Sequence, residues 1–208
     1  MYSLEEKKII LHTSHKVESL FKNYPVPAHG IKHIKHVVEY TKQIAKKEKT
    51  NIFLAEMSAW LHDIGRTLEI DDSFHGNKHH ELSYELCQKW FQEDKIYNKL
   101  NRKQKEILLY SVRYHWNNVA DKYDTAWILR DADKLDSLGK NGIERMLEFS
   151  EKDESKLELN LRLRYDIFYW LKTKTAKKIV KDKKMMEQID KFYFKLLKKE
   201  IKPIKIKK

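Results

Sequence analysis

The chain has 208 residues, enough for one domain with its own core, and we expect a single domain over residues 1–208. Its 43 Lys and Arg residues against 31 Asp and Glu residues give a net charge of +12, which favours anionic partners such as nucleotides, other phosphate esters or nucleic acid. Cys87 is the only cysteine, and no stretch approaches the ~18 apolar residues of a membrane span, so the composition excludes a disulfide-stabilised scaffold and an integral membrane protein and predicts a cytoplasmic location.

The N-terminal third predicts three helices separated by clear breaks. Five glycines, three prolines and no hairpin turn between alternating runs favour an all-α chain. Ser3 and Glu6 form a capping-box pattern, Pro25 and Pro27 interrupt the helical periodicity, and Asn51 is a good N-cap. We therefore expect helices over about residues 3–21, 31–47 and 51–61.

The rest of the chain continues the helical pattern after a polar loop at residues 67–76. Gly139 is expected to close one helix, and the segment beyond it is rich in lysine and aromatic residues. The expected helices cover about residues 79–91, 102–115, 125–139, 143–151, 155–178 and 182–201. The basic tail at 202–208, which contains Pro203, is expected to fray.

Histidine and aspartate residues recur at the predicted helix ends, next to apolar residues. They are His33, His62, Asp63, His79 and His115, with either Asp131 or Asp133. Imidazole and carboxylate ligands together suit Mn, Fe, Ni, Co or Zn better than Ca or Mg. Two such ions need about six protein ligands, with a carboxylate able to bridge them. The pattern therefore predicts a site for one or two divalent transition-metal ions between helices.

Five segments in order strengthen this interpretation: "HGIKHIKHV", "AWLHDIGR", "HHELS", "VRYH" and "RDADKLDSLG". Together they resemble the successive motifs of the HD-domain superfamily of metal-dependent phosphohydrolases, over about residues 29–145. The resemblance implies an all-helical bundle with its metal site among the helices. The C-terminal helices at about 155–201 lie outside the region that it covers.

The resemblance also implies a role for individual residues. His33 matches the first histidine ligand, His62 and Asp63 match the HD pair, and Asp133 matches the final aspartate, with Asp131 as its competitor. In members with two ions, Asp63 would bridge them and two further histidines would complete the second site. Those two are His115 and His79, with Ser83 as the small residue four positions after His79 and with His80 as the alternate ligand.

Arg66 departs from part of the family pattern. Within the family that the sequence resembles, several nucleotidases and the alarmone hydrolases carry an acidic residue three positions after the HD aspartate. Arg66 occupies that position here, so it argues against alarmone hydrolysis. Arg66 and Lys134 are candidate phosphate-binding groups, although each could equally form a structural ion pair. Gly65, just before Arg66, is expected to let the chain turn away from the HD pair.

The expected function is metal-dependent hydrolysis of a phosphomonoester or phosphodiester of a nucleotide-like substrate, with a metal-activated water as the nucleophile. Asp63, Arg66 and Lys134 are the residues assigned to catalysis. Two alternatives remain open: a nucleotide- or nucleic-acid-binding module without turnover, and a single-strand nuclease like the HD domains attached to CRISPR helicases. Four aromatic residues are expected mainly in the core or the pocket wall, although one of them could stack on a base. They are Trp60, Tyr114, Trp116 and Trp127.

Overall fold

The computed structural model describes residues 2–69, 78–150 and 154–200, and within these ranges the chain is helical without a strand. The α-helices are α1 (Leu4–Asn23), α2 (Ile31–Lys47), α3 (Ile52–Leu61), α4 (His79–Glu93), α5 (Arg102–Tyr114), α6 (Asp124–Asp136), α7 (Gly139–Ser150), α8 (Glu154–Trp170), α9 (Lys174–Asp182) and α10 (Met185–Glu200). Two short 3₁₀ helices, η1 (Ile64–Leu68) and η2 (Lys95–Lys99), follow α3 and α4. The all-α prediction is confirmed. Most of the predicted polar loop and the whole predicted tail lie outside the described residues.

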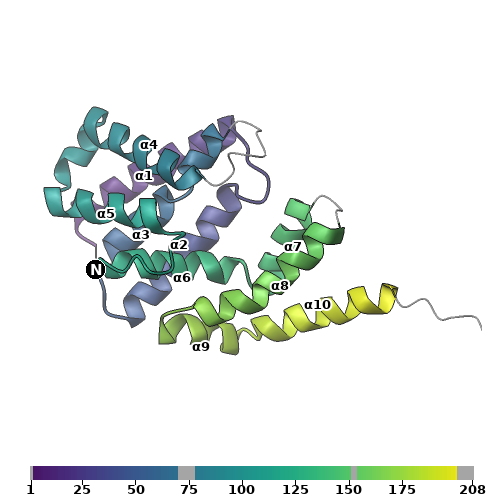
Figure 1. Ribbon diagram of the computed structural model, residues 1–208. Helices are drawn as coiled ribbons and strands as arrows, with labels where there is room; N and C mark the ends of the chain where they lie inside the picture. Colours follow the sequence, from purple (N-terminus) through teal and green to yellow (C-terminus); the bar gives the residue numbers. More distant parts are fainter. Residues whose placement is uncertain (1, 70–77, 151–153, 201–208) are drawn as a thin grey trace, which may run out of the picture.

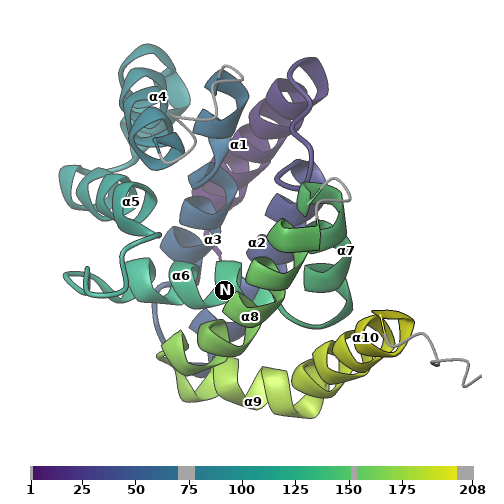
Figure 2. The ribbon, with the colours of Figure 1, turned by 45° about the vertical axis from the view of Figure 1, so that its right-hand side comes forward.

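Helix α3 is the centre of the bundle. Every residue from Phe53 to Leu61 is buried, as expected for a mostly apolar helix, and the two polar side chains of this stretch, Glu56 and Ser58, are buried with it. Helix α3 packs against α1, α2, α5 and α6, while α7 to α10 lie together on the other side of α6 (Figure 1). Figure 2 shows α10 at the edge of this group, where it packs against α7, α8 and α9. No helix in the described ranges has both the length and the apolarity that a bilayer crossing requires.

The ends of the helices follow local capping rules. Ser3 and Glu6 form the predicted capping box of α1, and the Asn51 side chain accepts a hydrogen bond from the Leu54 amide at the start of α3. Helix α3 ends just before the His62-Asp63 pair. The apolar run that drives α3 into the core therefore carries this pair to the interior of the molecule.

Gly65 matters because another helix approaches its backbone. A Cβ atom at this position would lie 2.4 Å from both the His79 carbonyl oxygen and the Ser83 amide nitrogen of α4. The Gly65 amide donates a 2.8 Å hydrogen bond to Ser83 Oγ, which fixes α4 on η1. This close packing, rather than a free turn of the chain, is what the glycine permits, and it places His79 beside the HD pair.

The prediction of two long C-terminal helices is wrong, because three helices occupy this region. The predicted helix at 155–178 is interrupted between Trp170 and Lys174. Thr173 caps α9 by accepting a hydrogen bond from the Ala176 amide, and the Asp131 carboxylate accepts hydrogen bonds from the Lys172 and Thr173 amides. Asp131 therefore satisfies backbone donors that a continuous helix would have used internally. The predicted helix at 143–151 also begins earlier, at Gly139.

Candidate metal centre

Two groups of three side chains meet in the middle of the bundle. The first group is His33, His62 and Asp133, and the second is Asp63, His79 and His115. Within each group the potential ligand atoms all lie within 4.8 Å of one another. In the first group, His33 lies on α2, Asp133 lies on α6 and His62 directly follows α3. In the second group, Asp63 follows His62, His79 begins α4 and His115 directly follows α5.

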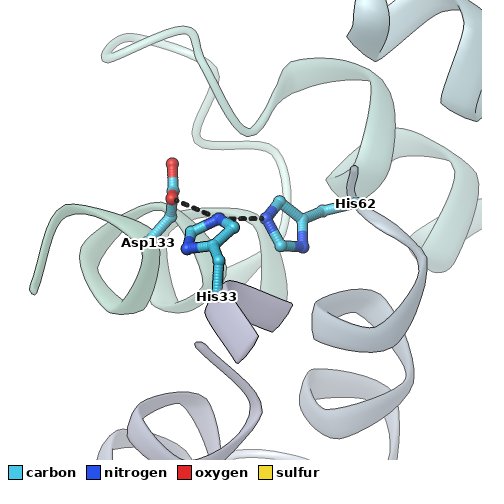
Figure 3. Close-up of side chains that lie close together, drawn as sticks. All are labelled: His33, His62 and Asp133. Carbon is cyan, nitrogen blue, oxygen red and sulfur yellow. Dashed lines mark hydrogen bonds and ion pairs between the residues drawn. The ribbon is translucent and has the colours of Figure 1, made fainter. Parts of the chain in front are cut away.

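The first group is centred on His33. Its Nε2 atom lies 3.3 Å from Nε2 of His62 and 3.4 Å from Oδ1 of Asp133. Figure 3 shows the His33 ring between the other two side chains. Ligands that bind one ion at about 2.0–2.2 Å lie roughly 3–3.5 Å apart, so these separations fit a shared cation.

Asp63 connects the two groups through its two oxygen atoms. Oδ2 lies 3.6 Å from Nε2 of His33 and 3.7 Å from Nε2 of His62. Oδ1 lies 3.5 Å from Nε2 of His79 and 3.7 Å from Nε2 of His115. Because each oxygen faces a different group, the Asp63 carboxylate is placed as a bridging ligand would be.

Hydrogen bonds on the outer side of the rings orient three of the histidines. The Nδ1–H groups of His62 and His115 donate to the Ala59 and Val112 carbonyls at 2.8 and 2.7 Å, and Nδ1 of His33 lies 2.7 Å from Asp136 Oδ2. These contacts leave the Nε2 lone pairs directed at the centre. Asp63 Oδ1 is buried without a hydrogen-bond partner among the described residues. Converging acceptors with an orphaned carboxylate oxygen fit a divalent cation.

The electrostatic environment favours the ligand forms of Asp63, Asp133 and His79, whereas for His33 burial is outweighed by hydrogen bonds to Asp136 and Asp63, which raise its pKa. Burial alone would raise the pKa of Asp63, but the nearby charges of His62 and Arg66 outweigh it and hold the pKa well below its usual value. Burial likewise opposes ionisation of Asp133, yet His33 and His62 lower its pKa to about 2. Burial lowers the pKa of His79 to about 2. Charged carboxylates and a neutral imidazole are the states that bind a metal ion.

The structure separates the competing candidates by position. Asp133 lies in the first group, whereas Asp131 points to the start of α9, where its carboxylate accepts backbone amides. His79 lies in the second group, whereas the ring of His80 packs on Trp116 with centroids 5.1 Å apart. The six side chains brought together are thus those that the sequence favoured.

Of the two predicted phosphate-binding residues, Arg66 contacts the ligand groups, and Lys134 follows Asp133 on α6. Arg66 Nη2 lies 3.4 Å from Nε2 of His79, and its Nη1 donates to Glu69 at 3.1 Å. Its buried Nε lies 3.7 Å from Asp63 Oδ2 and has no hydrogen bond among the described residues. Lys134 donates to Asn118 Oδ1 at 2.5 Å. Burial, with the charge of Arg130 as the next cause, lowers the pKa of Lys134 to about 8.

A second layer behind His33 was not predicted. Asp136 is fully buried, and its carboxylate accepts hydrogen bonds from His33, from His36 at 2.9 Å and from Arg145 at 2.9 Å. The sequence contained one indication of this residue: Asp136 follows Asp133 by three positions in "RDADKLD" and therefore lies near it on the same helix. Nothing in the sequence pointed to His36 or Arg145 as its partners.

Comparison with known proteins gives the family. The family model of the HD domain matches residues 30–138, which is more than half of the chain. No curated protein sequence matches the chain. A predicted HD superfamily hydrolase from an uncultured Thermotogales bacterium is 26% identical, with a TM-score of 0.65 over 90% of this chain and 91% of the other.

Two Bacillus structures are similar in fold at lower identity. Bacillus subtilis YpgQ in complex with ADP is 19% identical, with a TM-score of 0.70 over 97% of this chain and 99% of the other. An HD-superfamily hydrolase from Bacillus thuringiensis is 18% identical, with a TM-score of 0.70 over 93% of this chain and 97% of the other. These two matches show a shared fold, and the family model, which covers more than half of the chain, shows that the chain belongs to the HD domain family.

Proposed function

We propose that the protein is a metal-dependent phosphohydrolase that acts on a phosphate ester of the nucleotide type. The observation that carries the proposal is the pair of buried ligand groups joined by Asp63. The net charge of +12 supports an anionic substrate. YpgQ, a protein of the same fold, was crystallised with ADP, which supports a small nucleotide over a nucleic-acid strand.

The residues would divide between two ions. His33, His62 and Asp133 would hold one, His79 and His115 would hold the other, and Asp63 would contact both. Mn, Fe, Ni, Co and Zn are the ions that this set of imidazoles and carboxylates suits. A bound divalent ion supplies Lewis acidity and lowers the pKa of water from 15.7 to about 7, which provides a nucleophile at neutral pH.

The chain's own cations would position the substrate. Arg66 Nε lies 3.7 Å from Asp63 Oδ2 without a hydrogen bond among the described residues, so the guanidinium can donate to a phosphoryl oxygen at the centre while Glu69 holds its other side. Lys134 follows Asp133 and extends to the loop after α5. In these positions both side chains would neutralise phosphate charge and orient the ester towards Asp63.

Replacement of the shared carboxylate tests the proposal. In Asp63→Ala we expect the metal content to fall and hydrolysis of a chromogenic phosphomonoester or phosphodiester to drop by at least about 10³-fold, because both ligand groups lose a member. Metal content is measured on the purified protein, and turnover is measured with added Mn²⁺, Ni²⁺ and Co²⁺. Circular dichroism shows whether the helical content is retained.

Asp166→Ala is the control, because Asp166 lies exposed on α8 outside the two groups. It should keep both metal and turnover. Full activity of the wild-type protein after removal of all metal would refute the proposal. Tight metal binding without turnover of any phosphate ester would instead favour the non-catalytic binding module.

A further inference from the structure

An exposed tryptophan lies at the edge of the metal centre. Trp116 is 55% exposed, although it directly follows His115, which is only 3% exposed. Trp116 therefore presents aromatic surface directly next to the buried cluster, and an aromatic surface of this kind can stack on a base. Of the four aromatic residues that the sequence raised as candidates, Trp60 is buried, Trp127 lies under Lys172, and Tyr114 packs on Tyr110.

A row of rings connects Trp116 to the proposed ligands. The centroids of His115 and His79 lie 5.3 Å apart, those of His79 and His80 lie 5.4 Å apart, and those of His80 and Trp116 lie 5.1 Å apart. His80 and Trp116 meet at an interplanar angle of 38°, so His80 supports one face of the indole. More than half of the Trp116 side chain stays exposed, and Trp116 directly follows His115 in the chain.

The loop that begins at Trp116 is held in place. Arg130, which is 2% exposed, donates to the carbonyls of Asn117 and Ala120 and to the Asp121 carboxylate. Lys134 donates to Asn118 in the same loop. A rigid loop keeps the indole oriented before a ligand arrives, which reduces the entropy lost on binding.

We propose that Trp116, supported by His80, is the stacking surface for the base of a nucleotide whose phosphate lies at the metal centre. The inference rests on the proposed function and adds the part of the substrate that is recognised. Stacking uses the π-face that every base shares, so it selects for an aromatic base and discriminates little between bases. The substrate class is therefore nucleotides rather than sugar phosphates or phosphorylated alcohols.

Binding of a nucleotide and of its base-free counterpart tests the inference. We expect Trp116→Ala to weaken ADP binding by about tenfold and Trp116→Phe to restore most of it, because loss of one base–aromatic stack has an effect of this order. Binding of ribose 5-phosphate should not change. Both affinities are measured by titration calorimetry on metal-loaded protein, with circular dichroism to confirm that each variant is folded.

Trp170 provides a matched control away from the metal centre. It is also an exposed tryptophan, at 45%, and it ends α8, outside the two ligand groups. Trp170→Ala should leave ADP binding unchanged. Three results would overturn the inference: an unchanged ADP affinity in Trp116→Ala, an equal loss of ADP and ribose 5-phosphate, or an ADP loss in Trp170→Ala as large as that in Trp116→Ala. A protein that binds ADP through Trp116 but hydrolyses no ester would refute the proposed function alone.

Discussion

Asp136 explains why His33 presents Nε2 to the cluster. Its carboxylate lies 2.7 Å from Nδ1 of His33, so it accepts that proton and fixes both the tautomer and the ring orientation. Arg145 and His36 hold the carboxylate from its other sides. Although burial and the charge of Arg145 lower the pKa of His33, the hydrogen bonds to Asp136 and Asp63 outweigh them and raise it.

We predict that Asp136→Asn weakens binding of Mn²⁺ by about 10- to 100-fold, the usual effect of losing such a supporting carboxylate. An amide in this position accepts less strongly and can present its NH₂ group to His33, which would favour the wrong tautomer. Titration calorimetry with Mn²⁺ on metal-stripped protein measures the change directly, without reference to turnover.

Asp131→Asn is the matched control, because Asp131 is equally buried on the same helix but, within the described part of the chain, accepts backbone amides near α9. It should lower the free energy of unfolding by about 1–3 kcal/mol, since charge-assisted hydrogen bonds are weakened, and leave the Mn²⁺ affinity unchanged. Equal Mn²⁺ affinities in wild type and Asp136→Asn would show that His33 does not need this support.

The six side chains of the cluster were predictable because each lies at a helix end inside a recognisable motif. Asp136 was not, because its role depends on contacts with residues 103 and 100 positions away along the chain. A local pattern cannot distinguish Asp131, Asp133 and Asp136, which share one helix. The packing of α6 against α2 and α9 places Asp136 behind His33, Asp133 in the first ligand group and Asp131 against the start of α9.

At the scale of elements, the contact between η1 and α4 sets the position of the second ligand group. His79 is the first residue of α4, so any displacement of this helix moves its imidazole relative to Asp63. The contact is tight because Gly65 has no side chain and Ser83 has a small one. The sequence contained both residues, but which helix packs on the glycine became clear only in the folded chain.

We predict that Gly65→Ala lowers the free energy of unfolding by about 1–3 kcal/mol, because its Cβ would overlap backbone atoms of α4 that cannot move alone. Displacement of α4 should also weaken binding at the second group more than at the first. Chemical denaturation measures the first effect, and a two-site Mn²⁺ titration measures the second.

Ser83→Ala is the comparison for this contact. It removes the 2.8 Å hydrogen bond to the Gly65 amide without introducing an overlap, and should cost about 1 kcal/mol with both metal affinities largely kept. If Gly65→Ala were as stable as the wild type, the approach of α4 to η1 would not be as close as described.

The interrupted helix at 171–173 shows a second limit of sequence patterns. The segment "YWLKTKTAKK" has no proline or glycine, so its helical periodicity continues across the break. Thr173 is an acceptable N-cap, yet threonine also occurs within helices, and the deciding acceptor is Asp131 from a helix about 40 residues earlier. Tertiary hydrogen bonding therefore overrides the local preference here.

At the scale of the whole molecule, acidic side chains of the family-matched region hold the junction of α8 and α9. Asp131 accepts the amides of Lys172 and Thr173, and Asp121 pairs with the Lys172 ammonium group. Asp121 also accepts from Arg130 at 2.7 Å. These contacts connect the part of the chain that matches the HD family to the C-terminal helices, which lie beyond it.

Asp121 makes this connection dependent on pH. The hydrogen bond from Lys172 is the largest influence on the pKa of Asp121; burial opposes it, Arg130 adds to it, and the pKa is lowered overall. A carboxyl group whose pKa is lower in the folded than in the unfolded chain contributes stability above its unfolded pKa of about 3.9. That contribution is lost as the pH falls through the folded-state pKa.

We therefore predict that Asp121→Asn lowers the free energy of unfolding at pH 7 by about 0.5–1 kcal/mol, a modest value because the side chain is 40% exposed and its ion pairs are screened by solvent. The difference from the wild type should stay constant from pH 7 to about pH 5 and shrink below about pH 4, as the wild-type carboxylate takes up a proton. Urea denaturation at a series of pH values measures it. A difference that widens as the pH falls would contradict the assignment, because protonation would then be strengthening a contact that depends on the charge of Asp121.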